Sequence, residues 1–286
     1  MSKILVTGGL GFVGSHLVDF LAEKGHTITV IDNLCSESSN RSYQRHDVNY
    51  WIDDVRNLNS YKYENCQFDL IYHLAALARI QPSFKDPLSY LSTDIIGTAN
   101  VLEFARRKKA KVVYAGSSSA FAGPMLNPYA FAKYTGEQTC EMYNKVYDLS
   151  VVTARFFNVY GDRQPTSGTY ATVVGVFEGL KKQGKPLTIT GTGEQRRDFT
   201  HVSDIVSAFE ALGEGVHCAE IYQLGTGKNY SINELASLFD SEVVYIPPRP
   251  GEALITKANN SSAIEKLNWK PKQDLKNYVK RWLLEQ

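Results

Sequence analysis

Tyr129 and Lys133 are the two side chains of this sequence whose types and spacing could do chemistry together. They stand four residues apart in the run NPYAFAK, residues 127–133. On a helix this spacing puts both side chains on one face. A tyrosine beside a fixed ammonium is a candidate acid/base group, because positive charge favours the phenolate and lowers a pKa normally about 10. The same spacing also occurs in ordinary amphipathic surface turns, so the rest of the chain must decide between the two.

The elements that position this pair follow from the hydrophobic pattern of the first half of the chain. The expected strands are Ile4–Thr7, Ile28–Asp32, Tyr50–Asp53, Leu70–Leu74, Val112–Ala115 and Val151–Ala154. The expected helices are Gly14–Lys24, Leu88–Lys109 and Tyr129–Tyr147. Short β-branched runs that alternate with helix-length segments are typical of a parallel sheet covered by helices on both faces. We therefore predict an α/β fold with a doubly wound parallel sheet.

The second half of the chain has a looser pattern. Beyond about residue 155, loops rich in Gly, Pro and Tyr separate short elements, with a strand expected at Ile221–Leu224 and a helix at Ile232–Phe239. We predict a first domain over residues 1–155 and a smaller lobe made mainly of residues 156–286. The two are interleaved, and segments near residues 198–225 return to the first domain.

A glycine-rich loop follows the first expected strand. Its sequence is GGLGFVG, residues 8–14, with glycines spaced as GxxGxxG. Such glycines allow a tight turn, a close backbone approach to a pyrophosphate and close packing of helix on strand. The next helix then offers its free N–H groups to the anion. We assign Gly8, Gly11, Phe12 and Val13 to cofactor binding; the alternative is a purely structural turn.

Acidic residues at the ends of the next two strands extend this expected cofactor site. Asp32 ends the second strand, about twenty residues after the loop, where a carboxylate would accept hydrogen bonds from an adenosine ribose. An acid there repels a ribose phosphate and so favours NAD over NADP. Asn33 follows it, and Asp54 with Val55 after the third strand would hold the adenine. A plain acid at a strand end is the alternative for Asp54.

Many ordered motifs along the chain resemble those of one family. They are TGGLGFVG (7–14), DNL (32–34), HLAA (73–76), SSS (117–119), the Tyr129/Lys133 pair, RFFNVYG (155–161), RDFTHV (197–202), RPGE (249–252) and LNWKP (267–271). Together they resemble the extended short-chain dehydrogenase/reductases, specifically the nucleotide-sugar epimerase/dehydratase group with its UDP-glucose 4-epimerase-like members. The resemblance covers essentially the whole chain. It implies a Rossmann-like domain that binds NAD over residues 1–155 and a substrate-binding lobe after it.

The resemblance also implies roles for the residues of the first domain. Tyr129 would be the acid/base group on a sugar hydroxyl. Lys133 would bind the nicotinamide ribose and hold down the pKa of Tyr129. Ser118 would hydrogen-bond the same sugar hydroxyl and complete the catalytic set. Three residues would line the cofactor channel: Leu74, Ala75 and Ala76.

The expected substrate site draws on both parts of the chain. Residues that match diphosphate and nucleoside contacts include two arginines, which suit a diphosphate because the planar guanidinium donates two hydrogen bonds at once. An arginine after the HLAA run and the serine after Ser118 would face the sugar. The expected substrate-binding residues are Arg79, Ser119, Asn158, Arg197, Arg249 and Glu252.

The residues after Ser118 select among the reactions of the family. The 4,6-dehydratases carry an Asp-Glu pair there and the decarboxylases a glutamate, whereas this chain has Ser119 and Ala120. Elimination needs a second acid/base group, which is missing at this place. We therefore expect NAD-dependent epimerisation of a nucleotide-diphosphate sugar, favouring a UDP-sugar, at carbon 4 through a 4-keto intermediate. The alternatives are a 4-keto-sugar reductase, a 4,6-dehydratase, and a noncatalytic NAD-binding scaffold or sensor.

The chain departs from the family just before Tyr129. Only the segment SAFAGPMLNP, residues 119–128, separates Ser118 from Tyr129, and family members carry a considerably longer one. The usual tyrosine before the glycine of this segment is Ala122. Because the segment borders the sugar pocket, its shortening removes wall material there.

Composition excludes several other classes of protein. The 286 residues are 43% hydrophobic and carry a formal net charge of +1, without a long run of like charge. We expect no nucleic-acid and no membrane partner. Four cysteines without metal-ligand spacing predict no metal site and a cytoplasmic protein with reduced thiols. The resemblance implies a homodimer that pairs the helices Leu88–Lys109 and Tyr129–Tyr147 with their copies.

Overall fold

A computed structural model of the chain describes residues 1–37, 39–215 and 219–286, so Cys218 lies outside the described residues. Its centre is a seven-stranded sheet with the strand order β11-β6-β5-β4-β1-β2-β3. These strands are β1 (Lys3–Thr7), β2 (Thr27–Asp32), β3 (Asn49–Ile52), β4 (Leu70–His73), β5 (Lys111–Ser117), β6 (Val151–Phe156) and β11 (Ile221–Leu224). All neighbouring strands are parallel. The predicted Rossmann-like α/β class is confirmed.

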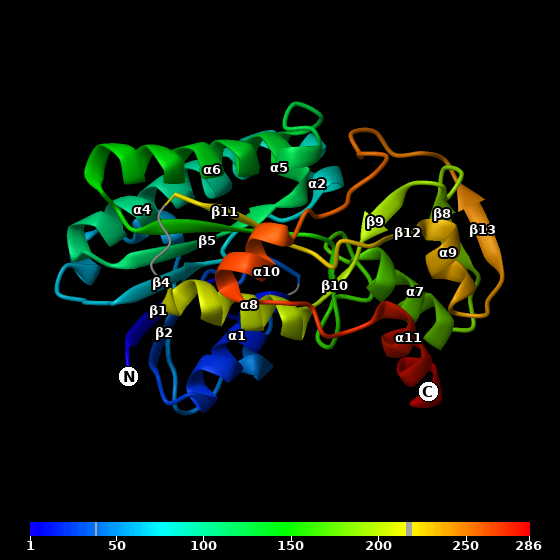
Figure 1. The fold of residues 1–286 in the computed structure, drawn as a ribbon, viewed down its shortest axis with the longest axis horizontal. Coiled ribbons are helices and arrows are strands. Elements are labelled where there is room, and N and C mark those ends of the chain that lie inside the picture. Colours follow the sequence, from blue (N-terminus) through cyan, green and yellow to red (C-terminus); the bar gives the residue numbers. More distant parts are fainter. Residues whose placement is uncertain (38, 216–218) are drawn as a thin grey trace.

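Helices cover both faces of this sheet (Figure 1). Helices α1 (Phe12–Glu23), α8 (Val202–Glu214) and α10 (Ser261–Leu267) lie on one face, and α4 (Gly97–Lys108) and α6 (Pro128–Tyr147) on the other. In β1, Ile4 and Val6 belong to the core under α1 and α8, while Leu5 belongs to the core under α4 and α6. A strand buried on both faces needs apolar side chains in both directions, which explains the continuous apolar runs of the sequence.

The helical stretch predicted over Leu88–Lys109 is confirmed with one difference: it runs unbroken from Pro87 to Lys108 and contains a π-helical turn. After α2 (Ile80–Lys85), this region forms α3 (Pro87–Tyr90), a π-helix (Leu91–Ile96) and α4. Asp86 starts α3, because its carboxylate accepts a hydrogen bond from the Ser89 amide at 3.2 Å. The wider π turn directs Thr93 and Asp94 into the interior. Within the described ranges, no helix is both long and apolar enough to cross a membrane.

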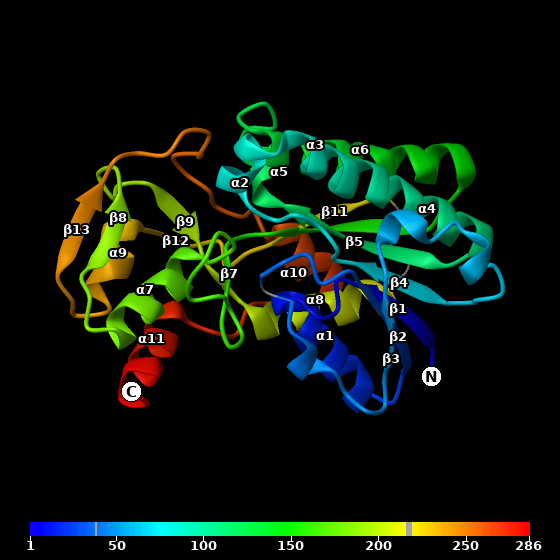
Figure 2. The ribbon, with the colours of Figure 1, turned by 180° about the vertical axis from the view of Figure 1, so that it is seen from behind.

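The second lobe has a hydrophobic core of its own. Its strands pair two by two: β8 (Leu187–Thr190) with β13 (Val243–Ile246), β9 (Arg196–Asp198) with β12 (Asn229–Ser231), and β7 (Val159–Tyr160) with β10 (Thr200–His201). Helices α7 (Val173–Lys182), α9 (Ile232–Ser237) and α11 (Leu275–Leu284) pack against them through a core that includes Phe177, Leu187, Leu235, Phe239 and Val279. Figures 1 and 2 show this lobe at the end of the sheet where the parallel strands terminate.

The chain crosses between the two parts more than once. After β10, helix α8 packs against α1 and β5, and β11 pairs with β6 in the large sheet. The motif at residues 267–271 lies where the chain returns to the second lobe after α10. It is bound to α8, because the Trp269 indole donates a hydrogen bond to the Asp204 carbonyl at 2.9 Å. The Asp204 carboxylate also accepts hydrogen bonds from the amides of Lys272 and Gln273, each at 3.0 Å. These bonds fix the second lobe on the sheet, while the domain limits given above stay a prediction.

Candidate active site

One cavity of ≈ 480 Å³ runs between the strand ends of the large sheet and the second lobe. All but one of the predicted site residues line it. These are Gly8, Gly11, Phe12, Val13, Asp32, Asn33, Val55, Leu74, Ala75, Ala76, Arg79, Ser118, Ser119, Tyr129, Lys133, Asn158, Arg197, Arg249 and Glu252. The exception is Asp54. Residues separated by almost the whole sequence thus share one cavity.

The glycine loop forms the tight turn from β1 into α1. Gly8 has φ +70°, and a Cβ there would lie 2.8 Å from the Ala75 amide nitrogen. A Cβ on Gly14 would fall onto the Gly8 carbonyl oxygen. Gly11 is the N-cap of α1 and provides no side-chain cap. The first N–H groups of α1 therefore keep their hydrogen-bonding capacity at the cavity wall, as an anion site requires.

Asp32 lies at the cavity wall at the end of β2, and only 6% of it is exposed. Its carboxylate accepts hydrogen bonds from the amides of Leu10 (3.0 Å) and Leu34 (2.8 Å) and from the Ser39 hydroxyl (3.3 Å). Two carboxylate oxygens provide about four acceptor positions, so acceptor capacity remains for a ribose hydroxyl. The uncapped start of α1 and this carboxylate together fit NAD: the first suits its pyrophosphate and the second an unphosphorylated ribose.

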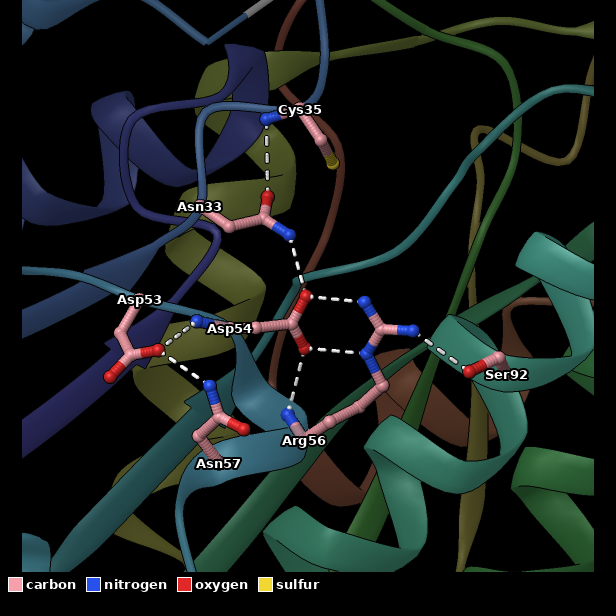
Figure 3. A network of polar contacts seen from close by, with 7 residues as sticks. All are labelled: Asn33, Cys35, Asp53, Asp54, Arg56, Asn57 and Ser92. Carbon is pink, nitrogen blue, oxygen red and sulfur yellow. Dashed lines mark hydrogen bonds and ion pairs between the residues drawn. The ribbon is translucent and has the colours of Figure 1, made fainter.

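Asp54, which we expected to hold the adenine of the cofactor, lies in a network of polar contacts (Figure 3). The Asp54 carboxylate forms an ion pair with Arg56 at 2.8 Å and accepts a hydrogen bond from the Asn33 amide group at 2.8 Å. It points into this polar network and does not line the cavity. Asp53 lines the cavity instead, with its carboxylate held by Asn57 at 2.7 Å. Asp53, rather than Asp54, therefore borders the cavity just after β3, and its carboxylate also accepts hydrogen bonds from Lys62 (2.8 Å) and Tyr63 (2.6 Å).

Helix α6 is fixed at two points beside the cavity. Asn127 caps it by accepting a hydrogen bond from the Ala130 amide at 2.7 Å, and its own amide group donates to the Gly251 carbonyl at 2.9 Å. One turn further on, the Lys133 ammonium donates to the Ala115 carbonyl of β5 at 3.0 Å. These contacts hold Tyr129 and Lys133 at the carboxyl end of β5, where both line the cavity.

In the protein chain itself, burial outweighs the groups that lower the pKa of Tyr129. Burial raises the pKa of Tyr129, while a hydrogen bond with Ser117 and the charge of Arg79 partly oppose this rise. Burial also lowers the pKa of Lys133, against the attraction of Asp94 and Glu137. The Tyr129 phenol is therefore protonated at neutral pH, and further positive charge is needed to make it a ready proton acceptor.

Ser117 is a site residue that the sequence reasoning missed. Its hydroxyl interacts with Tyr129 and also accepts a hydrogen bond from the Ser119 amide at 3.2 Å, which starts α5 (Ser118–Ala122). Ser118, the predicted catalytic serine, is buried and lines the same cavity. The run of three serines at the end of a strand was the available signal. Their sequence alone does not tell which hydroxyl meets the tyrosine.

The second lobe contributes cations and an amide to the cavity. Arg197 forms an ion pair with Glu252 at 3.4 Å, and its pKa is lowered by burial in spite of this carboxylate. Asn158 donates to the Asp198 carbonyl at 3.0 Å and has φ +30°, a backbone conformation rare outside glycine. Arg249 lines the same cavity. This arrangement suits an anionic ligand that spans both parts of the chain.

The shortened segment before Tyr129 is folded compactly. After α5 the chain turns at Gly123, and Leu126 packs against that glycine. Phe121, Met125 and Leu126 are exposed, with the Arg155 guanidinium 5.4 Å from the centre of the Phe121 ring. The segment therefore places apolar side chains on the surface beside the cavity.

Comparisons with known proteins agree with this geometry. A profile of the NAD dependent epimerase/dehydratase family matches residues 4–225. A putative UDP-glucose 4-epimerase of Methanocaldococcus jannaschii is 35% identical, over 97% of this chain and 96% of that protein. UDP-glucuronic acid decarboxylase 1 of Xenopus tropicalis is 30% identical, over 94% of this chain and 68% of that protein. The crystal structure of UDP-glucose 4-epimerase from Thermotoga maritima with UDP-glucose superimposes with a TM-score of 0.93 at 30% identity, covering 99% of both chains.

Asp94, in the π-helix, is a second residue that the sequence reasoning missed. It is 1% exposed, and one carboxylate oxygen accepts a hydrogen bond from the Leu77 amide at 2.8 Å. The other oxygen has no hydrogen-bond partner within residues 1–37, 39–215 and 219–286. Burial raises its pKa to about 6, and the charge of Lys133 opposes that rise. Its carboxylate also acts electrostatically on Tyr129. An acid within an apolar helical run was the sequence signal for it.

The substitution Asp94→Asn is expected to stabilise the protein above pH 6. The pKa rises from 3.8 in the unfolded chain to about 6 in the fold, so the folded protein binds more protons between these values. The contribution of Asp94 to stability is fully present below the unfolded pKa of 3.8 and is lost as pH rises through the folded pKa of about 6. The amide keeps the acceptor for Leu77 and removes the buried charge, which predicts a gain of roughly 1–3 kcal/mol at pH 7.5.

Urea unfolding of both proteins at pH 4.5 and pH 7.5 measures this effect. The gain should be clearly larger at pH 7.5 than at pH 4.5, where Asp94 is protonated in the folded protein but already largely ionised in the unfolded chain. Asp86→Asn is the matched control, because the Asp86 carboxylate is exposed and the introduced asparagine side chain can also cap α3. The free energy of unfolding should therefore change little at either pH. A variant at position 94 that is less stable than the native protein at pH 7.5 would mean that the ionised carboxylate is needed beside Lys133.

Proposed function

The chain belongs to the NAD dependent epimerase/dehydratase family, and we propose that it interconverts the carbon-4 epimers of a UDP-sugar through a 4-keto intermediate. One observation carries this proposal. The carboxylates that line the described part of the cavity are Asp32, Asp53 and Glu252, and none of them lies directly after Ser118, where Ser119 and Ala120 stand. Asp32 ends β2, Asp53 directly follows β3, and Glu252 pairs with Arg197. Around Tyr129 the cavity is thus lined by hydroxyl groups and by the cations Lys133 and Arg79. These groups suit a reaction that removes one hydroxyl proton of the sugar and returns it.

The protein's own residues would divide the work of this reaction. Bound NAD would supply reversible hydride exchange with carbon 4. Tyr129 takes the proton of the carbon-4 hydroxyl and later gives it back, while Ser117 hydrogen-bonds the tyrosine and Ser118 lines the same cavity. The fixed ammonium of Lys133 supplies positive charge beside the developing phenolate. The sugar must present both faces in turn, so the diphosphate has to stay anchored while the sugar turns.

The second lobe contains the groups for that anchoring. Arg197 and Arg249 line the same cavity, and the guanidinium group of an arginine can donate two parallel hydrogen bonds to phosphate oxygens. Asn158 adds an amide held in place by the Asp198 carbonyl. Binding energy at the diphosphate then remains available while contacts to the sugar change.

Elimination and decarboxylation fit this cavity less well. Both need a further acid/base group next to the tyrosine, and the positions after Ser118 are Ser119 and the buried Ala120. The buried carboxylates of Asp94 and Glu137 act electrostatically on Tyr129, but neither lines the cavity. A 4-keto-sugar reductase would use the same tyrosine and lysine and would release its oxidised cofactor in every turnover.

Product analysis of the purified protein with UDP-glucose, UDP-N-acetylglucosamine and UDP-glucuronic acid tests the proposal. At least one should convert to its carbon-4 epimer without added reductant. In Tyr129→Phe, kcat should fall about 10³-fold, as expected when a general acid/base is removed, while affinity for UDP stays the same. Tyr134→Phe is the matched control on the same helix and should keep native turnover, because Tyr134 does not line the cavity.

Three results would count against this assignment. Native turnover in Tyr129→Phe would remove the tyrosine from the mechanism. Product formed only in step with release of oxidised cofactor would identify a reductase. Loss of carbon dioxide or of water from the sugar would identify a decarboxylase or a dehydratase.

We also propose a homodimer that pairs the outer helices of the large sheet. Helices α4 and α6 lie side by side on its outer face (Figures 1 and 2). Exposed apolar side chains on this face are Leu88 (76% exposed) and Ile96 (54%) from the α3 and π-helical region, and Phe131 (37%) and Met142 (42%) from α6. A group of large exposed apolar residues on two adjacent helices favours contact with a second copy of the same face.

The double variant Ile96→Asp/Met142→Glu is expected to be monomeric, because it places charges in the proposed apolar contact. Sedimentation equilibrium of the native protein should give twice the chain mass. Leu284→Glu is the control, since Leu284 is 80% exposed near the end of α11, away from the proposed face. A monomeric native protein, or a double variant that remains dimeric, would contradict the proposed interface.

A further inference from the structure

Arg79 lies in the cavity with its guanidinium held from two sides. Its Nε donates to the Tyr170 carbonyl at 2.7 Å, and its Nη1 donates to the Ala78 carbonyl at 2.9 Å. Tyr170 belongs to the loop before α7, and Ala78 to the loop after β4. Both bonds go to main-chain oxygens, so the orientation of the guanidinium is set by the fold. The second nitrogen of the fork, Nη2, and one N–H of Nη1 remain for a ligand.

The charge of Arg79 has no counterion among the described residues. Burial lowers its pKa, and the groups that act on it electrostatically are the hydroxyls of Tyr129, Tyr90 and Tyr170, which are neutral at pH 7. Other arginines of the protein that are partly buried have a carboxylate, as Arg155 has Glu137 and Arg197 has Glu252. Holding a cation in a cavity without a counterion costs free energy, which an anionic group of a ligand would recover.

The position of Arg79 indicates which part of the ligand carries that anion. Arg79 influences the proton equilibrium of Tyr129, and both side chains line the cavity. The anionic phosphates have other partners at the uncapped start of α1 and at the arginines of the second lobe. The charge that Arg79 meets should therefore belong to the sugar whose hydroxyl Tyr129 deprotonates.

We propose that Arg79 binds a carboxylate on the sugar, so that the substrate class is a nucleotide-linked uronic acid. This inference rests on the function proposed above. A carboxylate is planar and carries one charge, and it matches the two free donors of a fixed guanidinium in a bidentate pair. A neutral sugar with a hydroxymethyl group at that place would leave the charge of Arg79 uncompensated.

Binding of two sugar nucleotides that differ only at carbon 6 tests the proposal. Isothermal calorimetry of the NAD-loaded protein should give at least about tenfold tighter binding of UDP-glucuronic acid than of UDP-glucose. In Arg79→Gln, affinity for UDP-glucuronic acid should fall roughly 10- to 100-fold, whereas affinity for UDP-glucose changes by less than about threefold. Arg79→Lys should lie between the two, because it keeps the charge and loses the planar fork.

Arg163→Gln is the control for loss of a positive charge elsewhere. Arg163 pairs with Asp19 at 2.7 Å outside the cavity, and its replacement should leave both affinities unchanged. Equal affinity of the native protein for both nucleotides overturns the proposal, and this result needs no variant to fold. An equal loss of both affinities in Arg79→Gln overturns it as well.

The same measurements separate this proposal from the proposed reaction. A preference for the uronic acid without carbon-4 epimerisation would refute the reaction and keep the role of Arg79. Epimerisation without any such preference would keep the reaction and refute the role of Arg79.

Discussion

The chemistry of this protein depends on one hydrogen bond that ties a helix to the end of a strand. The Lys133 ammonium donates to the Ala115 carbonyl, and with only 4% of Lys133 exposed this bond is what satisfies a buried cation. It sets the rotation of α6 over β5 and so aims Tyr129, one turn earlier, into the cavity. Asn127 fixes the start of the same helix and joins it to the loop that carries Arg249 and Glu252. Hydrogen bonds thereby join the proposed catalytic pair to the end of β5 and to the loop of the second lobe.

The electrostatics of the site follow from burial more than from any single neighbour. Burial raises the pKa of Tyr129 and of Asp94, and it lowers that of Lys133. The protein alone therefore keeps the phenol protonated. Two cations, Lys133 and Arg79, lie near it, and the buried carboxylates of Asp94 and Glu137 oppose their effect. The pKa of Tyr129 is therefore expected to change with the charges of a bound cofactor and substrate.

Much of this site is visible in the sequence because it depends on local rules. Alternating apolar runs predict the sheet and the glycine spacing predicts the turn into α1, while residues four apart place Tyr129 beside Lys133. Other features depend on packing that no local pattern records. An α-helix and a π-helix have similar apolar periodicity over so short a stretch as Leu91–Ile96, so the inward turn of Asp94 was missed. Which of Asp53 and Asp54 faces the cavity depends on the position of Arg56, and the pKa of Tyr129 depends on burial, which spacing does not reveal.

The central claim is that a hydride leaves carbon 4 and returns to the same carbon within one closed site. UDP-glucose and UDP-glucuronic acid deuterated at carbon 4, incubated with the NAD-loaded protein and followed by NMR, test it most directly. The account predicts that the accepted nucleotide yields its epimer with the deuterium still at carbon 4 and none in the water. Inversion with loss of the label to solvent, or label lost without inversion, would contradict it.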